Sequence, residues 1–282
     1  MNSIADSDAF FDPERMLAQH QAALTLLQGM LSDPHAPQIA WLDLASGRGQ
    51  IISHLQKNLS ETERKKIAYQ GYDIDNSHSR TAAKTAEAMG LAKYGFEIGE
   101  IGQFWQRGST GGPFDFITLT NTVHEIQPRC LAEILTRCVE RLSTNGRLFI
   151  YDMEKLPVSE LGAVLWTAAE IKKILTALFR SLGSETYEPS VGTWTHRTCN
   201  GWNAQIIRSH MQLPENFCDR SADAITATAT MIASLLELKL KVTMTALESL
   251  TRFGAETEEE ASNKEGLLFQ FWALSRALEG IK

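Results

Sequence analysis

Markers of secreted, membrane-spanning and zinc-binding proteins are missing from this chain of 282 residues. Its four cysteines, Cys130, Cys138, Cys199 and Cys218, form no C-x-x-C pair, so we expect neither a zinc site nor a disulfide framework. The segment Met1–Asp8 is acidic and has no apolar core, which argues against a signal peptide. Lys or Glu interrupts the longest apolar stretches well before they reach membrane-spanning length. These absences favour a soluble cytoplasmic protein that has no membrane partner.

The sequence also lacks an excess of positive charge. Its formal net charge is −7, so no large basic field would attract nucleic acid in general, although a local basic patch is compatible with that total. No internal repeat and no low-complexity tract stands out. The length fits one large domain or two small ones. We therefore expect a globular protein without general nucleic-acid binding.

Strand and helix patterns alternate along the first half of the chain. An amphipathic helix over 14–32 comes first, and Pro34 and Pro37 would end it. Strands are then predicted at 39–43, 67–73, 94–98, 114–121 and 147–152. Helices are predicted at 76–92, capped by Asn76, and at 127–142, and turns at 108–113 and at Asn145-Gly146. This β-α-β-α rhythm is typical of a parallel sheet covered by helices on both faces.

The second half of the chain carries different signals. Thr167 and Glu170 fit a capping box, and a helix from there would run to Leu182 and stop at Gly183. Asn200-Gly201 lies between β-rich runs at 187–198 and 202–211, which is a strong hairpin signal. From Ser221 onward the pattern is helical. Its two predicted helices are a long one with an apolar stripe at 225, 229, 232, 236, 240, 244 and 247 that ends near Gly254, and a final one that starts at 256–260.

The most informative stretch is residues 39–50, IAWLDLASGRGQ. An apolar run ends in Asp43, and Gly47 and Gly49 follow before the next helix begins. Glycine allows a positive φ and close approach of a ligand, and a helix start offers free N–H groups. A dinucleotide loop would need a small residue where Ile52 stands, and a phosphate-binding P-loop would need a Gly-Lys-Ser/Thr ending that is not there. The stretch therefore indicates a nucleotide-cofactor loop of another kind.

This loop resembles motif I of the class I S-adenosylmethionine-dependent methyltransferases, acid-x-Gly-x-Gly-x-Gly. Asp43, Gly47 and Gly49 match, and Ala45 stands in place of the first glycine. Further segments match the family in the same order, at 72–75, 96–100, 114–121 and 142–150, so that the resemblance covers roughly residues 38–212. It implies an α/β fold, namely a Rossmann-like sheet of mostly parallel strands closed by an antiparallel hairpin. The N-terminal helix and a C-terminal helical extension would flank that sheet.

The resemblance also implies S-adenosyl-L-methionine as the cofactor and assigns residues to it. Asp73 would bind the two ribose hydroxyls, since a carboxylate offers two oxygens to a vicinal diol, and Asp75 is the competing candidate. Glu100 would meet the adenine amino group, although a helix-start acid looks the same. The expected cofactor-binding set is Asp43, Ala45, Ser46, Gly47, Gly49, Asp73, Ile74, Glu100, Ile101 and Asn121. Asp43 could instead cap the turn that follows it, and Asp73 could be a solvated turn acid.

The segment after the fourth strand bears on the methyl acceptor. It lacks both the Pro-Pro-aromatic loop of amino-methylating DNA enzymes and the Pro-Cys nucleophile of cytosine-C5 enzymes. Residues 123–130 instead resemble the His-Asp-Trp segment of small-molecule O-methyltransferases. That resemblance implies His124 as general base on an acceptor hydroxyl, because imidazole titrates near neutrality. If Glu125 turns inward, it would either orient the ring or stabilise its charge. A histidine that only lines the pocket is the alternative, since an aligned sulfonium methyl group can react without a base.

Aromatic residues on and near the predicted hairpin would cover the acceptor. We assign Trp166, Trp194 and His196 to the substrate pocket and no residue to a metal. Strand alternation puts Trp194 and His196 on one face and Arg197 on the other. Trp202 fits ordinary packing slightly better than a pocket role.

Together these inferences predict an S-adenosylmethionine-dependent methyltransferase acting on a small or medium-sized acceptor, at oxygen rather than nitrogen. The alternatives are a protein or RNA methyltransferase that docks through its C-terminal helices, and a non-catalytic cofactor-binding relative, which Ala45 keeps open. The expected organisation is an N-terminal helical segment at 1–37, a methyltransferase domain at 38–212 and a helical extension at 213–282. That extension would form a cap over the cleft, a homodimer interface, or both.

Overall fold

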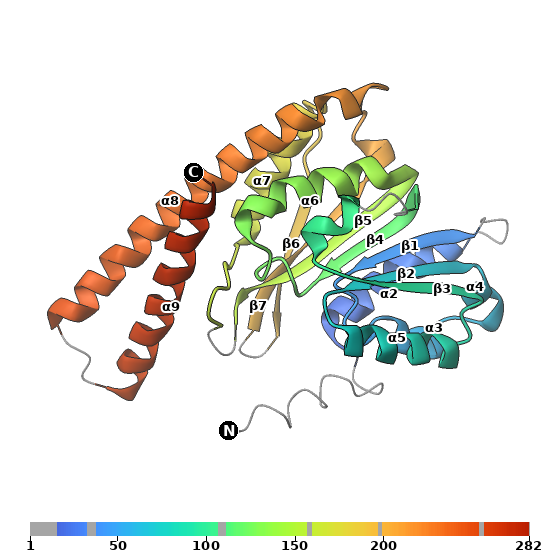
Figure 1. Cartoon of the computed structure of the whole chain (residues 1–282), viewed down its shortest axis with the longest axis horizontal. Helices are drawn as coiled ribbons and strands as arrows, with labels where there is room; N and C mark the ends of the chain where they lie inside the picture. The colour runs from blue at the N-terminus through green and yellow to red at the C-terminus, as the bar shows by residue number, and fades with distance from the viewer. Residues whose placement is uncertain are drawn as a thin grey trace. The chain divides into compact units, whose positions relative to one another are not determined.

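A computed structural model describes residues 16–32, 38–106, 111–156, 160–196, 199–253 and 257–281 (Figure 1). Its seven-stranded sheet has the order β3-β2-β1-β4-β5-β7-β6. The strands are β1 (Ile39–Leu44), β2 (Ile67–Asp73), β3 (Lys93–Ile98), β4 (Phe114–Thr120), β5 (Leu142–Lys155), β6 (Ser190–His196) and β7 (Cys199–Ile207). β1 pairs in parallel with β2 and β4, β2 pairs in parallel with β3, and β6 pairs antiparallel with β7. The predicted fold class, a mostly parallel Rossmann-like sheet with one antiparallel hairpin, is confirmed.

Helices connect the strands and extend the chain beyond them. The α-helices are α2 (Ala18–Leu31), α3 (Leu55–Asn58), α4 (Glu61–Lys65), α5 (Asn76–Ala88), α6 (Pro128–Arg141), α7 (Ala168–Ser181), α8 (Ser221–Phe253) and α9 (Glu258–Ile281). Short 3-10 helices include η2 (Ile101–Gln106) after β3. No helix in the described part of the chain is both long enough and apolar enough to span a membrane.

The chain divides into two compact units. The first comprises residues 1–120, 141–150 and 206–209, and the second comprises residues 121–140, 151–205 and 210–282. Strands β1 to β4 and helices α2 to α5 belong to the first unit, and helices α6 to α9 belong to the second.

The core of the first unit centres on β1, which is buried along nearly its whole length because strands flank it on both sides. Trp41 and Leu42 are fully buried there. The Trp41 ring packs edge-on against Tyr69 at 5.0 Å between centroids. Edge-to-face geometry of this kind adds about 0.5–1.5 kcal/mol beyond the area buried. This ring contact joins β1 to β2 within the core of the first unit.

A buried carboxylate lies in this core. Asp43, which is 1% exposed, accepts a hydrogen bond from the Thr118 hydroxyl at 2.6 Å and another from the Tyr69 hydroxyl at 2.7 Å. The Trp41 ring N–H in turn donates to the Thr118 oxygen at 2.9 Å. Burial is the main reason that the pKa of Asp43 rises to about 6, and the two hydroxyl donors oppose that rise. The carboxylate therefore links β1 to both of its neighbours at the point where the strand ends.

Helix packing dominates the second unit. Lys239 of α8 donates to both carboxylate oxygens of Glu170, at 2.8 and 2.6 Å, and its ammonium lies 5.8 Å from the centroid of the Trp166 ring. Glu170 also forms the capping box with Thr167 at the start of α7, as predicted. The predicted end of α7 at Gly183, which has φ of +100°, is confirmed as well. One carboxylate therefore both caps α7 and attaches α8 to it.

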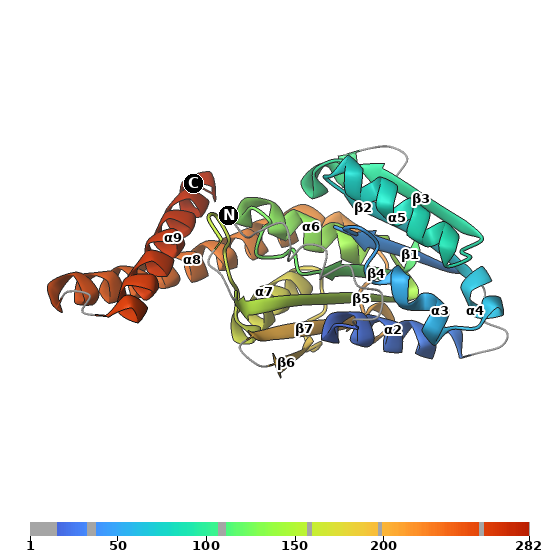
Figure 2. The ribbon, with the colours of Figure 1, turned by 90° about the horizontal axis from the view of Figure 1, so that it is seen from below.

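The two C-terminal helices form an antiparallel pair, and both views show α9 folding back along α8 (Figure 1 and Figure 2). Ile232 and Leu236 of the predicted apolar stripe are fully buried, and burying such side chains stabilises the second unit by about 1.5–3 kcal/mol each. Further along α8 the stripe is open to solvent, since Met244 is 43% exposed. The long helix is confirmed, and its exposed large apolar side chains lie in its second half, where Thr243 is nevertheless buried.

Both Asn-Gly dipeptides were predicted to be turns, and both predictions are wrong. Asn145-Gly146 lies inside β5, where a Cβ on Gly146 would come within 2.7 Å of the Phe114 carbonyl oxygen. Gly201 lies inside β7 opposite Trp194, whose ring would be 2.2 Å from a Cβ at that position. Close packing therefore requires both glycines, across the sheet at Gly201, and both across the sheet and against the local Ser143 backbone at Gly146.

Other local expectations differ by small amounts or cannot be compared. Asp75, not Asn76, is the N-cap of α5, because its carboxylate accepts from the Ser77 N–H. The expected helix ends at Pro34, Pro37 and Gly254, and the turn at 108–110, lie outside the described residues.

The raised pKa of Asp43 predicts a specific pH dependence of stability. Between about pH 3.8 and pH 6 the folded state binds this proton and the unfolded state does not, so the free energy of unfolding falls as the pH rises through that window. Asp43→Asn removes the titration and should gain up to about 3 kcal/mol relative to the wild type between pH 4 and pH 7. Urea unfolding of both proteins at several pH values measures this difference. Parallel curves would show that the carboxylate carries no such penalty.

Candidate functional site

The loop after β1 has the backbone conformation that the glycine pattern predicts. Ala45, Gly47 and Gly49 all have positive φ, at +58°, +53° and +82°. The Ser46 N–H donates to the Tyr72 carbonyl at 3.0 Å, which brings the loop to the end of β2. A Cβ on Gly49 would also lie 3.2 Å from the backbone of Ala82 in α5. The loop is thus held between a strand end and a helix, with its backbone conformation set by small residues.

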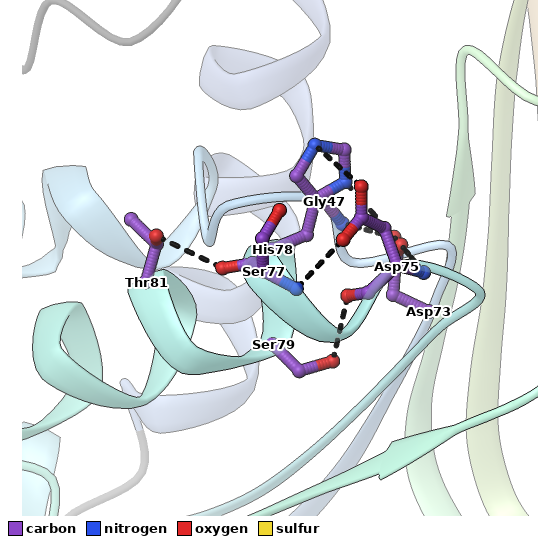
Figure 3. A network of polar contacts seen from close by, with 7 residues as sticks. All are labelled: Gly47, Asp73, Asp75, Ser77, His78, Ser79 and Thr81. Atoms are coloured by element: carbon purple, nitrogen blue, oxygen red, sulfur yellow. Dashed lines mark hydrogen bonds and ion pairs between the residues drawn. The ribbon is translucent and has the colours of Figure 1, made fainter.

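Asp73, at the end of β2, is the centre of a polar network beside this loop (Figure 3). One of its oxygens accepts from the Gly47 N–H at 2.8 Å, and the other accepts from the Asp75 N–H at 2.9 Å. The His78 Nδ1 lies 3.3 Å from the second oxygen. The side chain is 7% exposed, so the network fixes a nearly buried carboxylate against the glycine loop.

Asp75, the competing ribose candidate, has a structural role in the same network. Its carboxylate accepts from the Ser77 N–H at 2.6 Å, and this hydrogen bonding is the main reason that its pKa lies below the ordinary value. The His78 Nε2 lies 3.9 Å from its other oxygen (Figure 3). Asp75 therefore caps α5, whereas Asp73 faces the loop.

The end of β3 joins the same edge of the first unit. The Gly99 N–H donates to the Asp73 carbonyl at 3.0 Å, and the Tyr72 hydroxyl donates to the Glu100 carbonyl at 2.9 Å. The Glu100 side chain is exposed and Ile101 begins η2. Ile74 is 68% exposed, which is unusual for an isoleucine beside a buried strand. The structure therefore gathers nine of the ten expected cofactor residues within the first unit, although Asp43 lies inside the sheet.

A second group of expected residues belongs to the second unit. His124 is 4% exposed, and its Nδ1 lies 2.7 Å from a carboxylate oxygen of Asp152, near the end of β5. The other Asp152 oxygen accepts from the His124 backbone N–H at 2.7 Å, and Asp152 itself is 1% exposed. The His124 carbonyl accepts from the Val164 N–H at 2.8 Å. Backbone and ring are thus both anchored, which fixes the direction of Nε2.

The free edge of this imidazole faces two carboxylates. Its Nε2 lies 3.9 Å from Glu125 and 3.6 Å from Glu160. Burial acts to lower the pKa of His124, but the hydrogen bond to Asp152 and the charges of Asp152, Glu125 and Glu160 raise it above the ordinary value. Of the two roles expected for Glu125, Asp152 takes the orienting one, while the charge of Glu125 favours the protonated ring. The imidazole therefore lies in surroundings that favour positive charge.

Asn121 and Trp194 are further expected site residues that lie in the second unit. Asn121 has φ of +53°, its N–H donates to the Tyr151 carbonyl at 2.8 Å, and its buried side-chain oxygen has no hydrogen-bond partner among the described residues. The Trp194 ring stacks on Tyr151 at 4.9 Å, and its ring N–H is likewise buried without a partner. No described residue satisfies either group.

The remaining pocket candidates are Trp166 and His196. Trp166 is 1% exposed, and its carbonyl accepts from the ring N–H of Trp202, which is fully buried. Both tryptophans are therefore packed in the core of the second unit. The side chain of His196, and Arg197 as a whole, lie outside what the structure describes.

Sequence reasoning missed three residues that these networks contain. Asp152 ends an apolar run, LFIYD, and an acid after a buried strand could have marked it. His78 follows the Asp75 cap within one helical turn, so spacing could have placed it near Asp73. Glu160 carries no such signal, because only the fold brings it to His124.

Comparison with known proteins gives a family match. The methyltransferase-domain family matches residues 35–206, which is more than half of the chain. No curated protein sequence shows a significant match.

Solved structures of methyltransferases are similar in fold. Magnesium protoporphyrin IX methyltransferase from Synechocystis PCC 6803 with bound SAH is similar at 15% identity and a TM-score of 0.50, over 74% of this chain and 95% of that chain. The CurJ carbon methyltransferase is similar at 16% identity and a TM-score of 0.50, and the match covers 66% of this chain and 53% of that chain. M. capricolum TrmK in complex with S-adenosyl-homocysteine matches at 12% identity and a TM-score of 0.45, and the match covers 95% of this chain and 99% of that chain.

The conformation of Ala45 predicts the effect of restoring glycine there. A non-glycine residue at positive φ is strained by about 1–2 kcal/mol, while glycine adds about 0.5–1 kcal/mol of unfolded-state entropy. Ala45→Gly should therefore stabilise the fold by about 0.5–1 kcal/mol. Denaturant unfolding measures this as a higher midpoint with an unchanged slope. Ala40→Gly in β1 is the matched control, since its φ is ordinary and the change should destabilise. Equal losses in both variants would remove the argument from strain.

Proposed function

The chain belongs to the methyltransferase-domain family and is a class I S-adenosylmethionine-dependent methyltransferase, and we propose that it methylates a small or medium-sized acceptor at oxygen rather than nitrogen. The observation that carries the proposal is the buried His124 imidazole, whose Nδ1 is held by Asp152 and whose Nε2 has no hydrogen bond in the described structure. Such an imidazole suits a hydroxyl, which must lose its proton as it is methylated.

The residues at the carboxyl ends of β1, β2 and β3 fit S-adenosylmethionine. The backbone at Gly47 and Gly49 has positive φ without side chains, which leaves room for close approach of a ligand. Asp73 still has a free lone pair for a ribose hydroxyl on the oxygen that accepts the Gly47 N–H, whereas its other oxygen accepts the Asp75 N–H and lies 3.3 Å from the His78 Nδ1. The exposed Ile74 offers an apolar surface to adenine, and Glu100 offers a carboxylate to its amino group. When bound, the sulfonium of this cofactor supplies an activated methyl group.

Asp43 and Ala45 would contribute indirectly. Both oxygens of Asp43 are engaged inside the sheet, so we propose that it positions the loop and does not contact the cofactor. Ala45 has the conformation that glycine would have at that point, so the missing glycine is no reason to infer a non-catalytic relative.

His124 would take the acceptor proton at Nε2. Asp152 would keep the Nδ1–H in place and stabilise the imidazolium that results. Glu125, whose side chain is 62% exposed, lies on the open side of the ring and would face the acceptor. Asn121 and Trp194, with their unsatisfied buried groups, are the polar contacts that we assign to ligands, Asn121 to the cofactor and Trp194 to the acceptor.

The C-terminal helices support a further proposal about partners. Apolar side chains of α8 are exposed at Leu238 (57%), Val242 (62%) and Met244 (43%). Leu238 and Val242 are one helical turn apart and share a face, while Met244 points to another side of the helix, and exposed apolar faces can mark interaction sites. A homodimer through α8 stays a prediction, as does the alternative that this surface docks a protein or RNA substrate.

Cofactor binding through Asp73 is open to a direct test. Losing a hydrogen bond to a charged group costs about 1.5–3 kcal/mol, so Asp73→Ala should weaken binding of S-adenosylmethionine and S-adenosylhomocysteine alike by about 10- to 100-fold. Calorimetric titration measures both affinities. Asp75→Ala is the matched control and should lower the stability of α5 with little effect on binding. A larger effect from Asp75→Ala would mean that Asp75 is the ribose ligand.

The role of His124 needs a variant that preserves the fold. His124→Asn can keep an N–H toward Asp152 while it removes Nε2, so the anchoring contact is retained. We expect kcat to fall about 100-fold or more with the S-adenosylhomocysteine affinity unchanged. Formation of S-adenosylhomocysteine is measured with the first hydroxyl compound that supports turnover in a screen of phenols and aliphatic alcohols. An unchanged kcat would show that His124 only lines the pocket.

A further inference from the structure

Three side chains of the second unit converge on one point. The His124 Nε2 and one carboxylate oxygen each of Glu125 and Glu160 lie within 4.8 Å of one another. The individual separations from Nε2 are 3.9 Å to Glu125 and 3.6 Å to Glu160, both longer than a hydrogen bond. The three groups surround a space without bonding to one another.

The imidazole is held as histidine ligands of metals are held. Metal-binding histidines commonly donate the other ring N–H to a carboxylate, which fixes the ring and directs the free nitrogen. Asp152 does this here at 2.7 Å, and it also accepts the backbone N–H of His124. The His124 side chain is 5% exposed, so its Nε2 is a buried, oriented atom aimed at two carboxylates. This separates the group from an ordinary cluster of surface acids.

We propose that His124, Glu125 and Glu160 bind a divalent cation of the zinc class. One imidazole and two carboxylates form a ligand set that suits Zn²⁺ better than Mg²⁺, which prefers oxygen ligands alone and keeps its waters. Bond lengths of about 2.0–2.2 Å place the ligand atoms of a tetrahedral zinc about 3.3–3.6 Å apart. The observed separations from Nε2 exceed that range by a few tenths of an ångström at most.

Small movements would complete the site. The Glu125 and Glu160 side chains are 62% and 52% exposed, so they can rotate toward a cation without disturbing the core. The buried members, His124 and Asp152, are already in place. A fourth position would remain open to water.

The cation site is separate from the proposed methyl transfer, and its existence does not depend on that reaction. A metal on Nε2 takes the lone pair that would accept the acceptor proton, so the two cannot share that atom. The proposed base therefore acts in the metal-free form, and Zn²⁺ is a competing ligand of the same atom. None of the three ligands belongs to the cofactor set of the first unit.

The test measures Zn²⁺ binding to the full chain after treatment with a chelator. Isothermal titration with zinc chloride should give one equivalent per chain, and Mg²⁺ should not displace it. Glu160→Gln and Glu125→Gln should each weaken Zn²⁺ binding at least tenfold, and both positions are exposed, so neither change threatens the fold. Asp152→Asn should weaken binding about 10- to 100-fold by releasing the ring. Co²⁺ in place of Zn²⁺ should show the d–d absorption of a tetrahedral site.

Controls separate this site from other zinc ligands on the chain. Glu215→Gln alters an exposed glutamate outside the cluster, and Cys218→Ser removes an exposed thiol, so both should bind Zn²⁺ like the wild type. Titration of S-adenosylhomocysteine in the same samples shows whether the cofactor site is intact, which distinguishes failure of this proposal from failure of the proposed function. Absence of saturable binding, several weak equivalents, or unchanged affinity in both glutamate variants would overturn the proposal.

Discussion

The buried carboxylate of Asp43 is the contact on which the first unit depends. It lies at the end of the central strand β1 and receives hydroxyls from β2 and β4, so that three strands share one polar centre. An isolated charge at this depth would be very unfavourable, and the two hydroxyl donors offset part of that cost, while the raised pKa reflects the part that remains. Because the cofactor loop begins two residues later, its starting point is fixed by the same contact.

Carboxylates with little exposure and with both oxygens engaged also lie near the ends of two other strands. Asp73 ends β2 and binds the glycine loop and the start of α5 with its two oxygens. Asp152 lies in the last part of β5 and binds both the backbone and the ring of His124. In each case a carboxylate with little exposure uses both oxygens, so its position is determined by partners from different elements. Removing one partner would leave a buried acceptor unsatisfied, which costs more than the bond itself contributes.

The C-terminal helices are attached by a different kind of contact. Lys239 binds the glutamate that already caps α7, so α8 is fixed to a helix terminus and not to a strand. Apolar burial then covers the first half of α8, while its second half exposes Leu238, Val242 and Met244. Such an arrangement holds the helix pair firmly at one end and leaves an apolar surface at the other.

The sequence by itself determined the elements with strong local signals. These are the strand and loop at 39–50, the strand 67–73, the capping box at Thr167 and the long helix from Ser221. Periodicity and caps act over a few residues, so they can be read without the fold. The Asn-Gly dipeptides show the limit of this reasoning. Their glycines are required by Phe114 and by Trp194, which are distant in sequence or lie on the facing strand, and a turn signal cannot be told from such a packing requirement.

Tertiary structure alone decided which side chains meet. The sequence marked His124 and Glu125 because they are adjacent and match a family segment, but it could not show that Asp152, and not Glu125, holds the Nδ1 of the ring. Asp152 and Glu160 lie 28 and 36 positions along the chain from His124, and no local pattern links them to it. Their convergence depends on strand β5 and on the segment after it returning to the same place. Long-range contacts of this kind follow from chain topology, which a sequence specifies only through the whole fold.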